Sequence, residues 1–307
     1  MQQDSEHTDA HIPVLLKESI QMLNIKPSGC YLDATFGRGG HSREILKQLD
    51  PDGQLWVLDR DPEALACAND LASMDKRVRV CNGTFSQISE LTSRLDRIDG
   101  ALFDLGISSP QIDQAERGFS FQSDGPLDMR MNNQQGQSAA EWLARANVDE
   151  IAWVIQNYGE ELYADKIAQQ IVHSRQRLPI TKTKQLVEII LSVVPSISKG
   201  KHPATKVFQA LRMHVNDELD EIRRGIPQAL EKMHAGSRLA IISYHSLEHQ
   251  LISDIIKKRR TNHDCLDLTS NLPQLRKIGH AMKPGRDETL VNRRARSALL
   301  RTWEVKK

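Results

Sequence analysis

The sequence predicts an α/β fold in which helices cover both faces of a mostly parallel, doubly wound sheet, with an all-helical segment inserted into it. Over the first hundred residues, short apolar runs alternate with helix-like segments, and this succession requires right-handed crossovers between parallel strands. From residue 138 the pattern becomes helical and offers no strand candidate. A further apolar run near residue 240 predicts that the sheet resumes after the insert.

Each element of the first part follows from a local signal. A helix is expected at 41–49, and another begins at Pro62, because proline suits the first turn of a helix. Residues 105–137 are rich in Gly, Ser, Pro, Asp and Gln, which predicts a long loop that carries function. The first four strands are expected at 30–35, 55–58, 78–81 and 101–103.

The second part continues with helices and two late strands. Residues 204–233 are helical in pattern, and Gly225 and Pro227 are expected to kink or divide them. The inserted helices are expected at 140–146, 151–158, 162–173 and 183–194, and the late strands at 238–244 and 298–303. We therefore divide the chain into a first core part (1–120), an inserted helical domain (121–203) and a second core part (204–307).

Composition excludes several classes of protein. Of the 307 residues, 39% are hydrophobic and 26% are charged, which is typical of a soluble globular chain. No apolar run could span a bilayer, and residues 1–10 lack a secretory signal. The four cysteines have no spacing typical of a disulfide scaffold or a zinc site. We expect a cytoplasmic protein with no metal and no membrane partner.

The charge is unevenly distributed along the chain. Residues 257–307 carry 14 Lys and Arg against 5 Asp and Glu, although the whole chain has a net charge of only +1. A basic tail on an acidic body indicates a polyanionic partner. A solvated basic face is the alternative interpretation.

Four consecutive strand ends carry residues suited to a nucleoside. Gly39 and Gly40 let the backbone approach a ligand, and a helix N-terminus follows them. Asp59 is placed to accept the hydroxyls of a ribose, and Phe85 to lie against an adenine ring. Asp104 ends the fourth strand. Because the carboxyl ends of parallel strands meet at one edge of a sheet, these residues predict a single pocket.

The glycine-rich loop distinguishes between cofactors. A nicotinamide fingerprint needs a third glycine, where this chain has Ser42, and the lysine of a P-loop is absent. Asp33 precedes the loop, where it would repel a pyrophosphate but attract the ammonium group of S-adenosyl-L-methionine. S-adenosyl-L-methionine therefore fits best.

Longer strings resemble one family over nearly the whole chain, from His11 to about Arg301. It is the bacterial small-subunit ribosomal RNA methyltransferase H family, also called MraW. The strings are TFGRGGHS (35–42), LDRDP (58–62), DLGISSPQ (104–111), ERGFSF (116–121), DGPLDMRM (124–131), KHPAT (201–205), FQALR (208–212) and SYHSLE (243–248).

The resemblance implies a specific activity. The family transfers a methyl group from S-adenosyl-L-methionine to the N4 amine of one cytidine in the decoding centre of 16S ribosomal RNA, and the substrate is naked RNA or the small ribosomal subunit. Its fold is a class I, Rossmann-like methyltransferase core with an inserted helical domain for substrate recognition, and a homodimer is left open. The cofactor residues implied here are Gly39, Gly40, His41, Asp59, Phe85, Asp104 and Gln111.

Two residues are candidates for the catalytic step. Asp104, or backbone carbonyls of the loop that follows it, accepts the hydrogen bonds of the target amine, or else Asp104 only orients the cofactor. His245 stacks on the flipped cytosine or hydrogen-bonds to it, whereas Glu248 is favoured as an acid in the first turn of a helix that begins at Ser246. Tyr244 is favoured as a packing residue.

RNA contacts are expected from Lys199, Lys201, His202 and the basic residues 257–260, with solvated loops as the alternative. Arg130 contacts a phosphate, or pairs with Asp128 or Asp124. Two other functions remain open on these residues alone. One is an amino-methyltransferase acting on DNA or a small molecule, and the other is a non-catalytic RNA-binding module.

Overall fold

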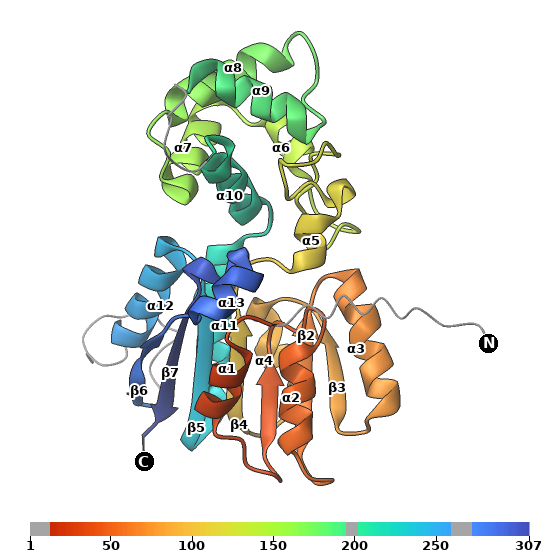
Figure 1. Ribbon diagram of the computed structural model, residues 1–307, viewed down its shortest axis with the longest axis vertical. Coiled ribbons are helices and arrows are strands. Elements are labelled where there is room, and N and C mark those ends of the chain that lie inside the picture. Colours follow the sequence, from red (N-terminus) through yellow and green to blue (C-terminus); the bar gives the residue numbers. More distant parts are fainter. Residues whose placement is uncertain (1–12, 195–201, 259–271, 307) are drawn as a thin grey trace, which may run out of the picture.

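The computed structural model describes residues 13–194, 202–258 and 272–306. Its sheet has the strand order β3-β2-β1-β4-β5-β7-β6, in which β7 is the one strand that runs opposite to the others (Figure 1). The strands are β1 (Cys30–Asp33), β2 (Gln54–Asp59), β3 (Val78–Asn82), β4 (Ile98–Asp104), β5 (Met233–Ser243), β6 (Leu275–Met282) and β7 (Leu299–Val305). The predicted doubly wound, mostly parallel sheet is confirmed.

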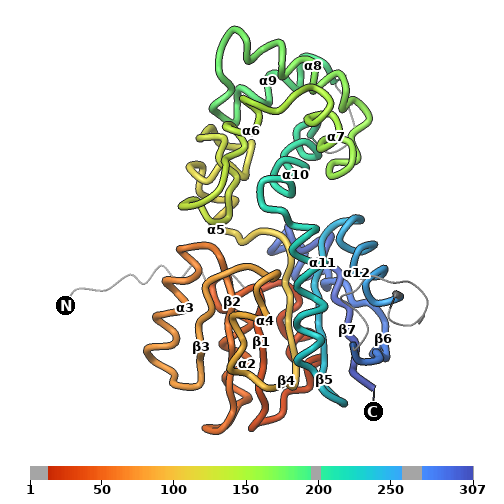
Figure 2. The backbone as a smooth tube through the Cα atoms, turned by 180° about the vertical axis from the view of Figure 1, so that it is seen from behind, coloured from red at the N-terminus to blue at the C-terminus, as the bar shows by residue number. Residues whose placement is uncertain are grey.

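Helices cover both faces of the sheet, as Figures 1 and 2 show from opposite sides. One face carries α1 (Leu16–Leu23), α2 (Gly40–Gln48) and α3 (Pro62–Met74), and the other carries α4 (Ile88–Leu91), α11 (Glu218–Glu231) and α12 (Ser246–Lys258). Because side chains alternate along a strand, neighbouring residues of β4 enter different cores. Leu102 packs with the first set of helices and Phe103 with the second.

The inserted helices form a lobe of their own beyond the carboxyl ends of the strands (Figure 1). They are α6 (Ala139–Arg145), α7 (Val148–Gly159), α8 (Ala164–Arg175), α9 (Thr183–Val193) and α10 (Ala204–Val215). Ser138 and Asn147 begin α6 and α7 with reciprocal capping boxes. Val207 and Phe208 of α10 belong to the apolar cluster of this lobe, so the chain returns to the sheet at α11 and not at residue 204 as the sequence predicted.

The helical stretch 204–233 is divided, but not where the sequence predicted. The break lies at Asn216 and Asp217, where Asp217 has a φ of 50°, and the prediction of a break at Gly225 or Pro227 was wrong. Asn216 leaves the helix because its buried side chain is held by a distant segment: Nδ2 donates to the Met129 carbonyl and Oδ1 accepts from the Met131 N–H, both at 2.7 Å. Gly225 and Pro227 lie inside α11.

Several elements had no clear signal in the sequence. They are α1, β6, and the short helices α5 (Ser109–Asp113), α13 (Arg286–Val291), η1 (Phe85–Gln87), η2 (Ala115–Arg117) and η3 (Arg293–Ser297). The loop 105–137 contains α5 and η2 and connects β4 to the lobe. Among the helices in the described ranges, none has the length and apolar character needed to cross a bilayer.

Candidate active site

A cleft of about 1370 Å³ lies at the carboxyl ends of β1, β2 and β4. It brings together most of the residues that the sequence assigned to one pocket, and Gly39 immediately precedes them at the start of α2. His245 is not among the lining residues, although its neighbour Tyr244 is. The predicted residues that line the cleft are Gly40, His41, Asp59, Phe85, Asp104 and Gln111.

The glycine-rich loop is packed so tightly that side chains would not fit. A Cβ on Gly39 would lie 2.5 Å from the Phe36 ring, and one on Gly40 would lie 2.1 Å from Pro13. Gly39 also has a φ of 73°, a conformation that favours glycine. No side chain caps α2, so its first backbone N–H groups, at Gly40 and His41 on the cleft wall, are open to a ligand.

The buried Asp33 and the half-buried Asp104 lie near this loop, and neither has a cationic partner among the described residues. Asp33 accepts hydrogen bonds from the Ser42 hydroxyl at 2.6 Å and from the Thr35 N–H at 3.1 Å. Burial raises the pKa of Asp33 to about 6 and that of Asp104 to about 7. Among the described residues neither carboxylate pairs with Lys or Arg, and the nearest base is His41, whose Nδ1 lies 4.0 Å from Asp104 Oδ2.

His41 does not supply the missing charge. It is 5% exposed, and burial lowers its pKa to about 4. The ring is therefore neutral in the range where Asp104 ionises. Its Nε2 is buried and has no hydrogen-bond partner within the described part of the chain.

Asp104 is held by Tyr244, which the sequence had favoured only for packing. The Tyr244 hydroxyl donates to Asp104 Oδ1 at 2.7 Å. Oδ2 accepts no hydrogen bond from any residue in the described ranges, and His41 Nδ1 lies 4.0 Å from it. In the register of β4 and β5, Asp104 pairs with Ile242. Tyr244 follows two residues later, so the pairing of these strands could have predicted this contact.

Glu248 fixes the backbone that carries Tyr244. It is 1% exposed, and its Oε2 accepts from the N–H groups of Tyr244 at 2.7 Å and His245 at 3.4 Å. The predicted helix start at Ser246, with Glu248 in its first turn, is confirmed. His245 lies on the side of this turn away from the cleft lining, with its Nε2 3.1 Å from Glu248 Oε1.

An ion-pair cluster borders the same cleft. Ligand atoms of Glu218, His245 and Glu248 lie within 4.8 Å of one another, a grouping that could hold a metal ion. However, both carboxylate oxygens of Glu218 accept from Arg212 at 2.8 Å, so a guanidinium already supplies a cation there. Arg212 and Glu218 line the cleft, and neither was predicted from the sequence.

The carboxylate of Asp59 is oriented by hydrogen bonds from three backbone N–H groups. Its Oδ1 accepts from the N–H groups of Arg60 and Asp61, and its Oδ2 accepts from that of Gly37. Burial raises its pKa, and these hydrogen bonds oppose that rise. A carboxylate has about four acceptor positions, so Asp59 retains room for one hydroxyl donor.

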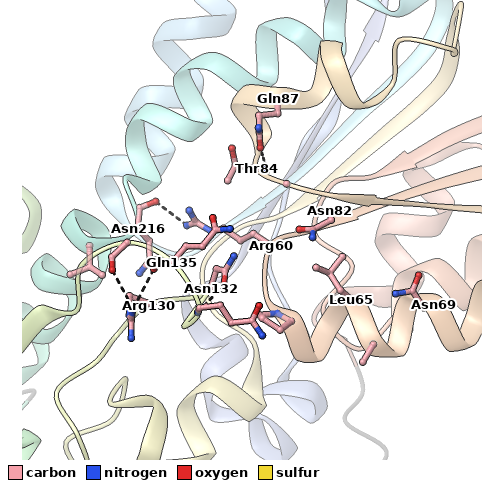
Figure 3. Close-up of a pocket in the computed structure, with 16 residues that line it drawn as sticks. Arg60, Leu65, Asn69, Asn82, Thr84, Gln87, Arg130, Asn132, Gln135 and Asn216 are labelled. Carbon is pink, nitrogen blue, oxygen red and sulfur yellow. Dashed lines mark hydrogen bonds between the residues drawn. The ribbon is translucent and has the colours of Figure 1, made fainter.

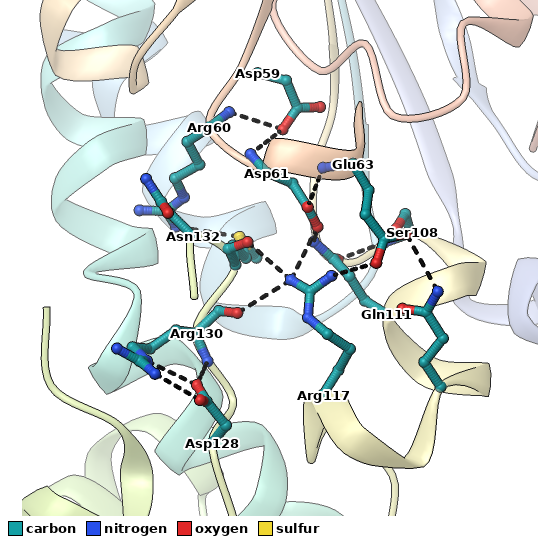
Figure 4. A network of polar contacts seen from close by, with 12 residues as sticks. Asp59, Arg60, Asp61, Glu63, Ser108, Gln111, Arg117, Asp128, Arg130 and Asn132 are labelled. Atoms are coloured by element: carbon teal, nitrogen blue, oxygen red, sulfur yellow. Dashed lines mark hydrogen bonds and ion pairs between the residues drawn. The ribbon is translucent and has the colours of Figure 1, made fainter. Parts of the chain in front are cut away.

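Gln111 joins a buried polar network that fixes the cleft wall (Figure 4). Its Nε2 donates to Asp61 Oδ2 at 2.7 Å, and its Oε1 accepts from the Ser108 N–H at 2.9 Å. Arg117 pairs with the same Asp61 oxygen at 3.0 Å and donates to the Met131 carbonyl. This network ties the loop after β4 to the start of α3.

Phe85 closes the cleft beside the end of β3. Its ring meets Phe103 edge-on, with the ring centroids 5.4 Å apart. Its backbone lies against Gly225 of α11, where a Cβ would come within 2.2 Å of Phe85 Cβ. The close approach of α11 therefore determines where this ring stands.

Of the residues predicted to contact RNA, two have partners within the protein and others lie outside the described residues. Arg130 pairs with Asp128 at 2.7 Å, which confirms the internal ion pair. His202 stacks on Phe121 with the ring centroids 4.7 Å apart, so it has a structural partner. Lys199, Lys201 and residues 259–260 lie outside the described residues.

The chemistry of this cleft fits S-adenosyl-L-methionine. Its sulfonium and ammonium groups bring the positive charge that Asp104 on the cleft wall lacks, and the uncapped start of α2 offers the N–H groups of Gly40 and His41. Asp33 lies behind this wall and does not line the cleft. The strand order with an antiparallel β7, together with this pocket at the strand ends, defines a class I methyltransferase. S-adenosyl-L-methionine is its methyl donor.

Comparison with known proteins identifies the family. The profile of the MraW methylase family matches residues 8–306, and the chain belongs to this family. A protein from Pseudoalteromonas atlantica named "Ribosomal RNA small subunit methyltransferase H" is 49% identical over 96% of this chain and 98% of its own. Proteins of the same name from Shewanella loihica and Thioalkalivibrio sulfidiphilus are 47% and 48% identical, each over 96% of this chain and 97% of their own.

Proposed function

We propose that the protein transfers a methyl group from S-adenosyl-L-methionine to the N4 amine of a cytidine in the decoding centre of 16S ribosomal RNA, within the small ribosomal subunit. The names of the relatives and the resemblance of the motifs support the substrate class. One observation carries the choice of reaction: Asp104 offers a free acceptor, Oδ2, inside the cofactor cleft. An exocyclic amine donates two hydrogen bonds, and such an acceptor can hold one of them.

Asp104 is the acceptor for the target amine. The N4 lone pair of cytosine is delocalised into the ring, so the amine is a poor nucleophile and needs alignment as well as an acceptor for its N–H. Tyr244 occupies Oδ1 and so turns Oδ2 toward the incoming base. As the new N–C bond forms, Oδ2 holds the N–H and takes its proton. S-adenosyl-L-methionine would supply the electrophilic methyl group, whose bond to sulfur breaks as the N–C bond forms, so that the neutral thioether is the leaving group.

The cofactor is held by residues on four strand ends. Gly39, Gly40 and His41 offer backbone N–H groups, Asp59 takes a ribose hydroxyl, and Phe85 lies against the adenine. Gln111 shapes the opposite wall from its network with Asp61. His245 does not line the cleft, and it acts through Glu248 to hold the turn at Tyr244.

The helical lobe recognises the RNA. A base paired in a duplex cannot present its amine to a buried sulfonium, so the target must be unpaired or flipped. The lobe lies beyond the strand ends, over the edge of the sheet where the cleft opens (Figure 1). A strand held between lobe and sheet would place one base in the cleft.

Transfer of a labelled methyl group tests this function. We expect label in N4-methylcytidine when the protein is incubated with 16S ribosomal RNA or assembled small subunits, as identified by mass spectrometry of the digested nucleosides. DNA and free cytidine serve as the comparison substrates. Label that appears only in DNA, in a small molecule or in another nucleoside would contradict the proposal.

A further inference from the structure

A second cavity, of about 750 Å³, lies beside the cofactor cleft (Figure 3). It shares Arg60, Gly83 and Thr84 with the cleft, so the two spaces meet at a common wall. The remaining walls come from α3, from the loop 130–136 and from the junction between α10 and α11. Nothing in the reaction derived above uses this space.

The roof of the second cavity is a fixed structure. Asn216, 4% exposed, holds the Met129 carbonyl and the Met131 N–H at 2.7 Å. Arg130 then donates to the carbonyls of Gln135 and Gly136 and so closes the loop above the space. The loop is thus held by one buried hydrogen bond, from Asn216 to the Met129 carbonyl, and by further bonds nearer the surface. A cavity with such a fixed wall is preformed for an occupant.

The lining of the second cavity is rich in amide side chains and contains no Asp or Glu. Seven of its sixteen residues are Asn or Gln, and the charged ones are Arg60 and Arg130. Arg130 is neutralised by Asp128, whereas Arg60 forms no ion pair with any residue in the described ranges. Its Nη2 instead donates to the Asn216 carbonyl at 2.9 Å. An unpaired guanidinium therefore stands at the wall between the two cavities.

Three amide side chains that line the cavity are available to a ligand. The side chains of Asn69, Asn82 and Gln134 form no hydrogen bond to another residue of the described part of the chain. An amide presents a donor beside an acceptor, which matches the edge of a nucleobase. The volume lies within the range of about 300–1,000 Å³ that is common for sites of small ligands.

We infer that the second cavity binds another unpaired nucleotide of the RNA strand whose target base enters the cleft. This inference rests on the proposed function. The base lies against the amides of Asn69 and Asn82, and Arg60 contacts the phosphate group that passes the common wall. The protein thus reads two positions of one strand, and only the base in the cleft is methylated.

Two acidic substitutions in the second cavity test the inference. The double variant Asn69→Asp/Asn82→Asp keeps the size of both side chains but replaces two amide donors with charges that repel RNA. Gln48→Glu/Gln54→Glu is the matched control, because it adds two charges at exposed positions on α2 and at the start of β2, the opposite end of the sheet. Affinity is measured by fluorescence anisotropy for single-stranded RNAs that extend to increasing lengths on either side of the target cytidine.

We expect the cavity variant to bind the longer RNAs at least about tenfold more weakly than the unmodified protein, with an unchanged affinity for S-adenosyl-L-methionine by calorimetry. The control and the shortest RNA should show no such loss. Equal affinity of both variants for every RNA would overturn the inference, and so would a loss of cofactor affinity in the cavity variant, because the space would then belong to the cofactor. Failure of the unmodified protein to form N4-methylcytidine would instead refute the proposed function, and the anisotropy series does not depend on turnover.

Discussion

Asp104 is the residue on which the proposed chemistry depends. It ends β4, receives the Tyr244 hydroxyl at 2.7 Å and keeps its second oxygen free in the cleft. Because burial raises its pKa to about 7, a substantial fraction is protonated near neutral pH in the free protein. A bound sulfonium favours the ionised form, so cofactor binding prepares the acceptor.

Removing the Tyr244 hydroxyl should impair Asp104 without changing the fold. Burial raises the pKa of Asp104 and the Tyr244 hydrogen bond opposes that rise, so Tyr244→Phe should move the acidic limb of kcat/KM to higher pH. We expect kcat to fall about tenfold or more, because Oδ2 is no longer oriented. Tyr158→Phe in α7, a tyrosine that does not line the cleft, is the control. Unchanged kinetics in Tyr244→Phe would remove Tyr244 from the site.

The raised pKa of Asp104 predicts that replacing this residue with Asn stabilises the protein by an amount that depends on pH. A carboxyl with a raised pKa in the folded state stabilises the fold when protonated, and this contribution is lost as the pH rises through the folded pKa, here about 7. Asn does not titrate, so the Tm of Asp104→Asn relative to that of the unmodified protein should rise from about pH 4, where the unfolded carboxyl ionises, and level off near about pH 8, by about 2 °C or more in total. Asp70→Asn, at an exposed position of α3, should show no such trend, and a Tm difference independent of pH would refute the assigned pKa.

The acidic strand ends could be predicted from the sequence because parallel strands bring their carboxyl ends to one edge. Asp59 and Asp104 illustrate this, since both line the cleft. The hydroxyl of Tyr244 could not be assigned a role, because 140 residues separate it from Asp104. That contact follows only from the pairing of β4 with β5, which no local pattern encodes.

At the scale of elements, the approach of α11 to η1 sets the position of the proposed adenine contact. Gly225 lies where a Cβ would meet Phe85 Cβ at 2.2 Å and the Phe85 carbonyl oxygen at 2.9 Å. The backbone of η1 cannot yield to such a contact as a flexible side chain would. The glycine that the sequence suggested as a helix breaker therefore serves close packing.

Gly225→Ala should separate α11 from η1. We expect the free energy of unfolding to fall by about 1–3 kcal/mol through overpacking, and the affinity for S-adenosyl-L-methionine to fall as the Phe85 ring moves. Thermal unfolding and calorimetry measure the two effects. Gly285→Ala is the control, because its Cβ would meet no atom within 4 Å, and equal stability of both variants would contradict the packing described here.

Periodicity predicted the helices of the lobe because each has a continuous apolar face, such as Leu186 and Ile190 of α9. The break between α10 and α11 had no such signal. It depends on the hydrogen bonds from Asn216 to Met129 and Met131, which join segments far apart in the sequence. Tertiary contacts of this kind override local propensity.

At the scale of the whole molecule, a Rossmann-like sheet provides the cofactor cleft and a helical lobe lies beyond it (Figure 1). The buried pair Asp61–Arg117, at 3.0 Å, is one tie between the two, because Arg117 also holds the Met131 carbonyl. The MraW family match spans both parts. The order of elements and the insert were predictable from the sequence, whereas the exact border was not, because α10 packs with the lobe.

The uneven charge of the chain predicts a salt-dependent affinity for RNA. The basic C-terminal part should bind RNA mainly through contacts of Lys and Arg with phosphates, which release counterions, whereas the acidic body contributes no such contacts. Raising the salt concentration from about 50 mM to about 200 mM should weaken binding of the RNA substrate by about tenfold or more. The affinity for S-adenosyl-L-methionine, measured in the same buffers, should change far less. A flat response for RNA would show that the basic residues are only a solvated surface.

The turnover of Asp104→Asn at saturating S-adenosyl-L-methionine, with cofactor affinity measured separately, tests the central claim most directly. Asn keeps the shape of the side chain but cannot take a proton from the amine, so kcat should fall at least about 100-fold while the cofactor still binds. An unchanged kcat, with only the cofactor affinity reduced, would show that Asp104 orients the cofactor and that another group accepts the amine hydrogen.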